Sequence, residues 1–212
     1  MAVELAVFPL GAVLMPHMPL PLRIFEDRYL IMLSRILQQE PSEFGVVLIE
    51  RGQESGGGET RFSRGTVARV VDLQGDDGAI GLMTRGGRRF EVTEWLADDP
   101  YPRAMVEFVG ELEWDDALVP LLERTDQTVR RTLALASEYA DQTWPSDIEL
   151  SDDPEQLAWQ LAAIAPLAEL DHVALLRSPT YSALLDGVID ECLAVESTLG
   201  WLDDDPDGAA RE

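Results

Sequence analysis

The first half of the chain is patterned for β-structure, with one early helix. Hydrophobic and polar residues alternate in several short runs, and the run at 44–50 is largely apolar, as in a strand buried on both faces. Turn sequences at 75–78 and 86–87 separate three of these runs. Apolar residues at spacings of four and three predict a helix over 26–38. The predicted strands cover residues 4–8, 19–25, 44–50, 61–73, 79–85, 88–96 and about 103–113.

After Trp114 the hydrophobic period lengthens to that of helices. A long amphipathic helix is expected over 118–139, with Asp115 and Asp116 at the end where the helix dipole favours negative charge. Asp153 and Pro154 have the composition of an N-cap and a first helical turn. The further predicted helices cover about 154–164, 170–177 and 181–199, with Gly200 as the final stop.

These elements predict an α+β protein with two lobes and a tail. Residues 1–114 form a β-rich lobe, in which several strands in short-range hairpins indicate a small, partly open barrel. Residues 115–200 form an α-helical bundle lobe. Residues 201–212 are expected to be an acidic, disordered tail.

The charge of the 212-residue chain is strongly negative and unevenly distributed. The net charge is −24, of which residues 1–103 carry −4 and residues 104–212 carry −20. Such a surface repels nucleic-acid phosphates and anionic membranes, so neither is an expected partner. Solubility is the simplest explanation of the charge, and a preference for basic partners is the alternative.

The chain contains no lysine, because all 16 basic residues are arginine. A Walker-type nucleotide site requires a lysine on the phosphates, and a Ser-Lys peptidase requires one as its base. A Schiff-base enzyme requires the same amine. Residues 51–60 contain three consecutive glycines, but no lysine or helix start follows them, so a flexible linker is expected there. The sequence therefore predicts a protein that is not an enzyme of these classes.

The remaining chemically active side chains form no catalytic or metal-binding pattern. His17 and His172 lie in different lobes, and neither has nearby ligands at metal-site spacing. Cys192 occupies an apolar helical seam, as a core cysteine does. The paired carboxylates fall in turns, helix starts and the tail, where local hydrogen bonding explains them. No cofactor and no metal is expected.

The single cysteine and the N-terminus give an expectation about compartment. Cys192 cannot form an intramolecular disulfide, which suits a reducing cytoplasm. No basic segment precedes the apolar stretch at the N-terminus, so a secretory signal is not expected. The expected location is cytoplasmic.

Several motifs, in order, resemble the Lon substrate-binding domain, the N-terminal module of the Lon ATP-dependent protease family. They are FPL at 8–10, LPL at 20–22, IFE at 24–26 with RY at 28–29, FGVVLI at 44–49, GTVARVVDL at 65–73 and RGGRRFEV at 85–92, with weaker matches at 157–167 and 174–180. The resemblance implies a PUA-like β pseudobarrel in the first lobe. It also implies a non-catalytic, stand-alone module that binds unfolded or client polypeptides, with an ATP-dependent protease supplied by another chain.

One apolar set is the candidate peptide-binding site of such a module. It comprises Leu14, Met15, Met18, Phe25, Tyr29 and Met32, from the loop after the first strand and from the first helix. Methionine adapts to varied partners, so an exposed part of this set would form a groove for extended peptide. The alternative is that these residues are core.

Three other functions remain open on the sequence. Arg85, Arg88 and Arg89 are expected at a hairpin tip, and PUA-like folds can bind RNA; solvated strand ends or intramolecular ion pairs are the alternative. A metal-independent hydrolase could use the carboxylates. The helical lobe could also make the protein a structural, dimerising subunit, so a monomer and a homodimer are both compatible with the sequence.

Overall fold

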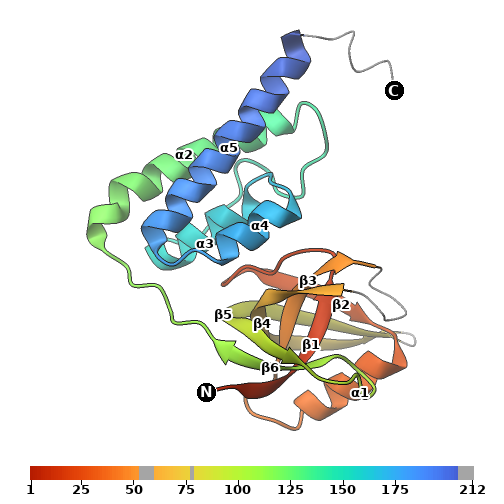
Figure 1. The fold of residues 1–212 in the computed structure, drawn as a ribbon. Coiled ribbons are helices and arrows are strands. Elements are labelled where there is room, and N and C mark those ends of the chain that lie inside the picture. Colours follow the sequence, from red (N-terminus) through yellow and green to blue (C-terminus); the bar gives the residue numbers. More distant parts are fainter. Residues whose placement is uncertain (53–59, 77–78, 205–212) are drawn as a thin grey trace. The chain divides into compact units, whose positions relative to one another are not determined.

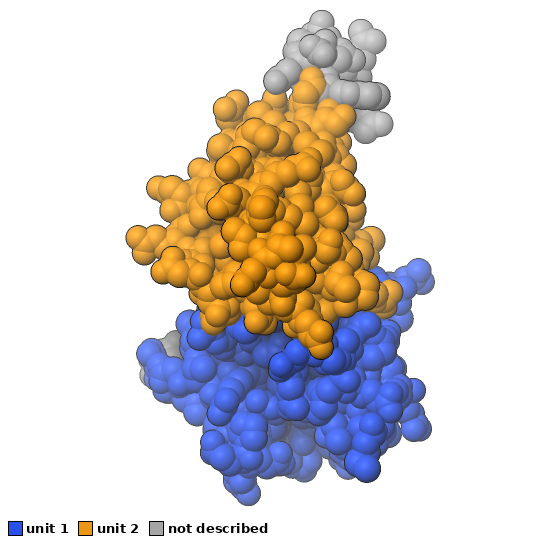
Figure 2. All heavy atoms as spheres, turned by 90° about the vertical axis from the view of Figure 1, so that its left-hand side faces the viewer, with its two compact units in different colours: residues 1–111 blue, residues 112–212 orange. Residues whose placement is uncertain are grey.

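The computed structural model describes residues 1–52, 60–76 and 79–204 (Figure 1). It divides into two compact units, Met1–Glu111 and Leu112–Glu212, which Figure 2 shows in different colours. The first unit ends at Glu111, whereas the boundary predicted from the sequence lies near residue 114. Most of the glycine-rich segment and the last part of the acidic tail fall outside the described residues.

The first unit is a mixed β-sheet with one helix, α1 (Asp27–Ile36). Its strands are β1 (Val3–Leu10), β2 (Pro19–Ile24), β3 (Glu43–Arg51), β4 (Thr60–Asp76), β5 (Ala79–Trp95) and β6 (Arg103–Phe108). The strand order is β2-β5-β4-β3-β1-β6, and β5 also pairs with β6. The pairings therefore lead from β5 through β4, β3, β1 and β6 back to β5. Among the strands that the structure describes, β1 and β3 run parallel to each other and all other paired strands are antiparallel.

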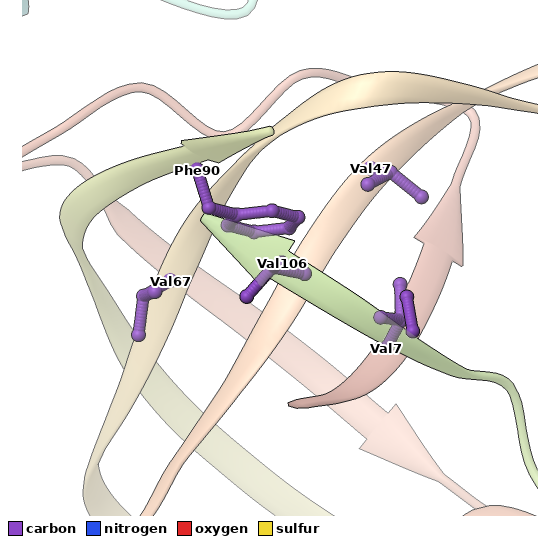
Figure 3. Close-up of a cluster of buried hydrophobic side chains, with 6 residues drawn as sticks. Val7, Val47, Val67, Phe90 and Val106 are labelled. Atoms are coloured by element: carbon purple, nitrogen blue, oxygen red, sulfur yellow. The ribbon is translucent and has the colours of Figure 1, made fainter. Parts of the chain in front are cut away.

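The sheet encloses a valine-rich cluster of buried side chains around the ring of Phe90. Figure 3 shows Phe90 of β5 among branched side chains from neighbouring strands, and its exposed fraction is 0%. Burying such a ring contributes about 1.5–3 kcal/mol relative to leaving it in water. The apolar run on β3 is buried at consecutive positions from Phe44 to Leu48, as the sequence predicts for a strand covered on both faces. The cluster comprises Val7, Val47, Val67, Phe90, Ala104 and Val106.

The predicted turn at Gly86-Gly87 is wrong, because β5 runs through these glycines without interruption. A Cβ atom at position 86 would lie 2.1 Å from the carbonyl oxygen of Met15, so glycine is needed there for a close approach of two main chains. Gly86 N–H donates to the Met18 carbonyl (2.8 Å) and His17 N–H donates to the Gly86 carbonyl (2.9 Å). The loop after β1 is thereby fastened to the middle of β5.

The second unit is a set of helices, of which η1 and α3 begin with aspartate caps. They are the short 3₁₀ helix η1 (Asp116–Leu118), α2 (Val119–Ala136), α3 (Pro154–Ile164), α4 (Glu169–Leu176) and α5 (Tyr181–Asp204). Asp115 accepts from Ala117 N–H (2.9 Å) and caps η1, and Asp153 accepts from Gln156 N–H (3.0 Å) and caps α3. The mixed sheet of the first unit and these helices make the fold α+β.

Helix α5 continues to Asp204, so the predicted stop at Gly200 is wrong. The disordered tail expected from residue 201 stays a prediction, because most of it lies outside the described residues. A Cβ atom at position 200 would meet no atom within 4 Å, so the space around this position does not require a glycine. Further back, α5 is joined to α2 by a polar contact. Glu196 accepts hydrogen bonds from the Arg131 guanidinium (2.9 Å) and the Thr132 hydroxyl (2.6 Å).

Candidate polypeptide-binding groove

The first unit contains a groove of about 180 Å³ between two strands and a helix start. It lies at the C-terminal end of β1, along β2 and over the first residues of α1. Concave sites of this kind, apolar with a few polar groups, are the usual binding sites of proteins. The lining residues are Phe8, Leu10, Pro21, Leu22, Arg23, Ile24, Phe25, Glu26 and Tyr29.

The aromatic part of the groove is built from β1 and α1. The rings of Phe8 and Tyr29 lie 4.1 Å apart between centroids at an angle of 35°. Tyr29 is fixed in place because it belongs to the buried face of α1, while Ile24 anchors the end of β2 with 2% exposure. Phe25 lies between β2 and α1, and 60% of its surface is exposed. The groove therefore has a fixed aromatic floor and a Phe25 ring available to a partner.

Charged groups lie beside this apolar surface and also form part of the groove, because Arg23 and Glu26 are lining residues. The Glu26 carboxylate accepts from the Arg28 guanidinium at 3.0 Å, and the same guanidinium lies 4.5 Å from the centre of the Tyr29 ring. Arg23 and Asp27 are exposed nearby on the chain. Since positive and negative side chains are both present, they produce no strong net electrostatic field at the groove. The apolar floor is therefore its main feature.

The six residues of the predicted peptide-binding set are not all in the groove. Phe25 and Tyr29 line it, and Phe25 alone of the six is exposed. Tyr29 is 3% exposed and contributes a ring face to the floor. The other four are core residues of the first unit in this structure, with exposures of 5% for Leu14, 1% for Met15, 7% for Met18 and 1% for Met32.

The sequence interpretation missed the strand residues of the groove. Phe8 and Leu10 come from β1, and Pro21, Leu22 and Arg23 from β2. The prolines at 19 and 21 were a usable indication, because prolines at alternate positions of a strand mark a sheet edge. Nothing in the sequence indicated that residues of β1 and β2 would line the same groove.

The two histidines and the cysteine lie in surroundings typical of residues with a structural role. The main chain of His17 adopts φ 65°, and its N–H donates to the Gly86 carbonyl of β5. Burial lowers the pKa of His172 below its ordinary 6.5, against the raising effects of Glu169, Asp171 and main-chain carbonyls. Burial raises the pKa of the Cys192 thiol to about 11, so it is a protonated thiol at neutral pH. Within the described residues no group of three or more His, Cys, Asp or Glu could hold a metal ion.

The three arginines of the candidate RNA site have partners within the protein. Arg85 donates to the His17 carbonyl (3.3 Å), Arg88 to the Glu43 carboxylate (3.4 Å) and Arg89 to the Gly110 carbonyl (3.3 Å). Arg89 is also buried. Because β5 is continuous, these residues are not at a hairpin tip, and the prediction of that position is wrong. Their contacts favour the intramolecular alternative.

A second hollow, in the helical unit, is polar. It has a volume of about 480 Å³ and is bordered by the end of α2 and the segment that follows it. Two carboxylates line it, Asp141 and Asp147, beside the ring of Trp144. No histidine or cysteine lines it, and its other polar side chains are those of Ser137, Gln142 and Ser146.

Comparison with known proteins identifies the family. The model of the ATP-dependent protease La (LON) substrate-binding domain matches residues 4–191. The chain belongs to this family. Among curated proteins, the Lon protease of Anaeromyxobacter dehalogenans (strain 2CP-C) is 33% identical over 109 residues, which are 50% of this chain and 13% of that protein. The chain thus matches only a small part of the length of that relative.

Two solved structures support the fold. The Lon N-terminal domain protein from Xanthomonas campestris has a TM-score of 0.66 and 26% identity, covering 89% of this chain and 98% of its own. The N-terminal domain of Mycobacterium avium complex Lon protease has a TM-score of 0.62 and 17% identity, covering 90% and 98%. In the part of the chain that the structure describes, no helix has the length and apolar character needed to cross a bilayer.

Proposed function

We propose that this Lon substrate-binding domain binds unfolded or client polypeptide segments in the groove between β1, β2 and α1. The observation that carries the proposal is the exposed Phe25 beside the fixed Phe8–Tyr29 pair, in a chain of this family. Exposed aromatic side chains next to a preformed apolar floor are typical anchors of protein interfaces. A client segment would insert an apolar side chain between Phe25 and this floor.

The chain acts without catalysis in this proposal. A module that lacks lysine can contribute neither a Walker nucleotide site nor a Ser-Lys dyad. In this proposal, the destruction of a bound client is carried out by the separate ATPase and peptidase of an ATP-dependent protease acting in trans. The closed series of strand pairings described above supports a PUA-like pseudobarrel as the scaffold. The site would then be mounted on a rigid sheet rather than on a mobile loop.

Polypeptide is favoured over RNA as the ligand by the arginine contacts and by the charge. Arg85, Arg88 and Arg89 use part of their hydrogen-bonding capacity on groups of the same chain, and the partner of Arg88 is a carboxylate. A net charge of −24 opposes phosphate binding, which depends on several cationic contacts. An apolar floor gains its binding energy from buried area instead, and this does not require positive charge.

The affinity for an unfolded polypeptide tests the proposal. With fluorescently labelled casein as the probe, we expect Phe25→Ala to weaken binding about thirtyfold, since truncating an aromatic anchor costs about 2 kcal/mol. The matched control is Leu170→Ala in the helical unit, because Leu170 is 63% exposed and Phe25 60%. Unchanged binding by the Phe25 variant, or an equal loss in the control, would refute the proposal.

A further inference from the structure

The outer edge of β2 carries few main-chain hydrogen-bond donors. Among the described strands β2 pairs only with β5, and Gly86 N–H donates to the Met18 carbonyl just before β2 begins. Main-chain groups alternate in direction along an antiparallel strand, so Met18, Leu20 and Leu22 turn theirs toward β5. Pro19, Pro21 and Arg23 therefore turn theirs outward, and Arg23 alone of these three carries an N–H.

β1 also carries a proline near the groove, but it is not an edge strand, because it pairs with β3 on one side and with β6 on the other. Val7 N–H donates to the Pro102 carbonyl (2.9 Å), away from the parallel partner β3. Pro9 follows two residues later, so its main-chain groups also point away from β3, and it too has no N–H. Pro9 is buried, so the edge that an added strand could reach is that of β2, where Pro19 and Pro21 are exposed and present carbonyl acceptors without donors.

A strand added along the outer edge of β2 could not satisfy its own main-chain carbonyls. Strand addition gains affinity from alternating main-chain donors and acceptors. Opposite Pro19 and Pro21, the carbonyls of an incoming strand would lose water without gaining a donor. Side-chain contact with Phe25 and the Phe8–Tyr29 floor has no such penalty.

We infer that the groove binds apolar segments through their side chains, and that its substrate class includes segments with proline or without main-chain N–H groups. This inference rests on the proposed function of the groove. Segments of this class occur in the extended polyproline II form, which needs no hydrogen bonds from a neighbouring strand. Pro19 and Pro21 are then specificity-determining positions, because they disfavour strand addition at the β2 edge as a binding mode.

A pair of synthetic peptides tests the inference. The first is a fluorescein-labelled peptide of alternating Phe or Leu and Ser, and the second is its twin with alternate main-chain nitrogens methylated. We expect the intact protein to bind both with affinities within about twofold, as for binding without main-chain pairing. A tenfold or greater weakening of the methylated twin would overturn the inference while leaving the proposed function intact. Failure of both peptides to bind would overturn the proposed function and the inference with it.

A donor added to the edge provides the second measurement. Pro21→Val restores an N–H at an exposed strand position, and Pro19→Val does so one pair further along. In these variants we expect the unmodified peptide to bind several-fold tighter than its methylated twin, although the intact protein does not distinguish them. Equal affinities for the twins in both variants would overturn the role assigned to the prolines, since the added donor would then have no effect on binding mode.

Discussion

Phe25 and Tyr29 differ sharply in exposure although they are four residues apart. A helix over 26–38 was expected to carry Phe25, Tyr29 and Met32 on one stripe, but α1 begins at Asp27. Phe25 therefore precedes the N-cap residue Glu26, whose main chain is extended (φ −75°, ψ 135°), and it does not follow the helical period. One position at a helix boundary decides whether a predicted core residue becomes a surface residue.

The two kinds of residue in the predicted set should differ in their effect on stability. Met32→Ala removes a side chain that is 1% exposed, and we expect it to lower the free energy of unfolding by about 2–5 kcal/mol. Phe25→Ala removes a side chain that is 60% exposed, and we expect a change of less than about 0.5 kcal/mol. Urea titrations followed by circular dichroism measure both. Similar losses in the two variants would show that Phe25 is a core residue.

His172 should make stability depend on pH. Burial lowers its pKa in the folded protein, with Glu169 and Asp171 opposing the shift, so the unfolded chain binds a proton first as pH falls. Its contribution is therefore fully present above pH 6.5, the ordinary pKa, and is lost as pH falls from there through the lower folded pKa.

The matching variant is His172→Gln, which cannot take up this proton. The free energy of unfolding of the variant should improve relative to that of the natural protein as pH falls from 7.5 to 5, by at most about 1.4 kcal/mol per pH unit. A difference between the two proteins that stays constant over this range would contradict the assignment.

At the scale of elements, the sequence predicted types and approximate bounds better than connections. Asp115 and Asp153 both cap helices, because a short acidic side chain before a helix satisfies free N–H groups whatever the tertiary structure. Gly86 was misinterpreted because a glycine pair has the same appearance in a turn and in a close main-chain approach. Only the distant Met15 carbonyl distinguishes the two, and local sequence does not contain it.

Gly86 and its neighbour form a matched pair for testing this approach. A Cβ atom at position 86 would meet the Met15 carbonyl oxygen at 2.1 Å, whereas one at position 87 would lie 3.5 Å from the nearest oxygen. We expect Gly86→Ala to lower the free energy of unfolding by about 1–3 kcal/mol, because the loop after β1 must move away. Gly87→Ala should lie within about 0.5 kcal/mol of the natural protein in the same urea titration. Equal effects would show that the close approach does not hold the loop.

At the scale of the whole molecule, the sequence predicted the α+β class and the family, but not the site. The groove exists because β1 is parallel to β3 while β2 joins the opposite edge of the sheet beside β5. Such pairings depend on contacts between residues far apart in the chain, which periodicity does not encode. Phe25 could be selected from the sequence, but its partner Phe8 required the fold.

The charge and the missing lysine also act at this scale. They exclude chemistry rather than specify binding, since a net charge of −24 without lysine removes whole classes of nucleotide and amine-dependent sites. In their place we propose recognition by an apolar surface on a sheet scaffold. The central claim of this account is therefore that the groove at Phe25 contacts unfolded polypeptide directly.

Photo-crosslinking tests this claim most directly. A benzophenone amino acid is placed at position 25 in one protein and at position 170, of similar exposure, in a second. Each is irradiated with casein, and crosslinked peptides are identified by mass spectrometry. The account predicts abundant casein adducts from position 25, suppressed by excess unlabelled casein, and few from position 170. Equal crosslinking from the two positions, or none from position 25, would contradict it.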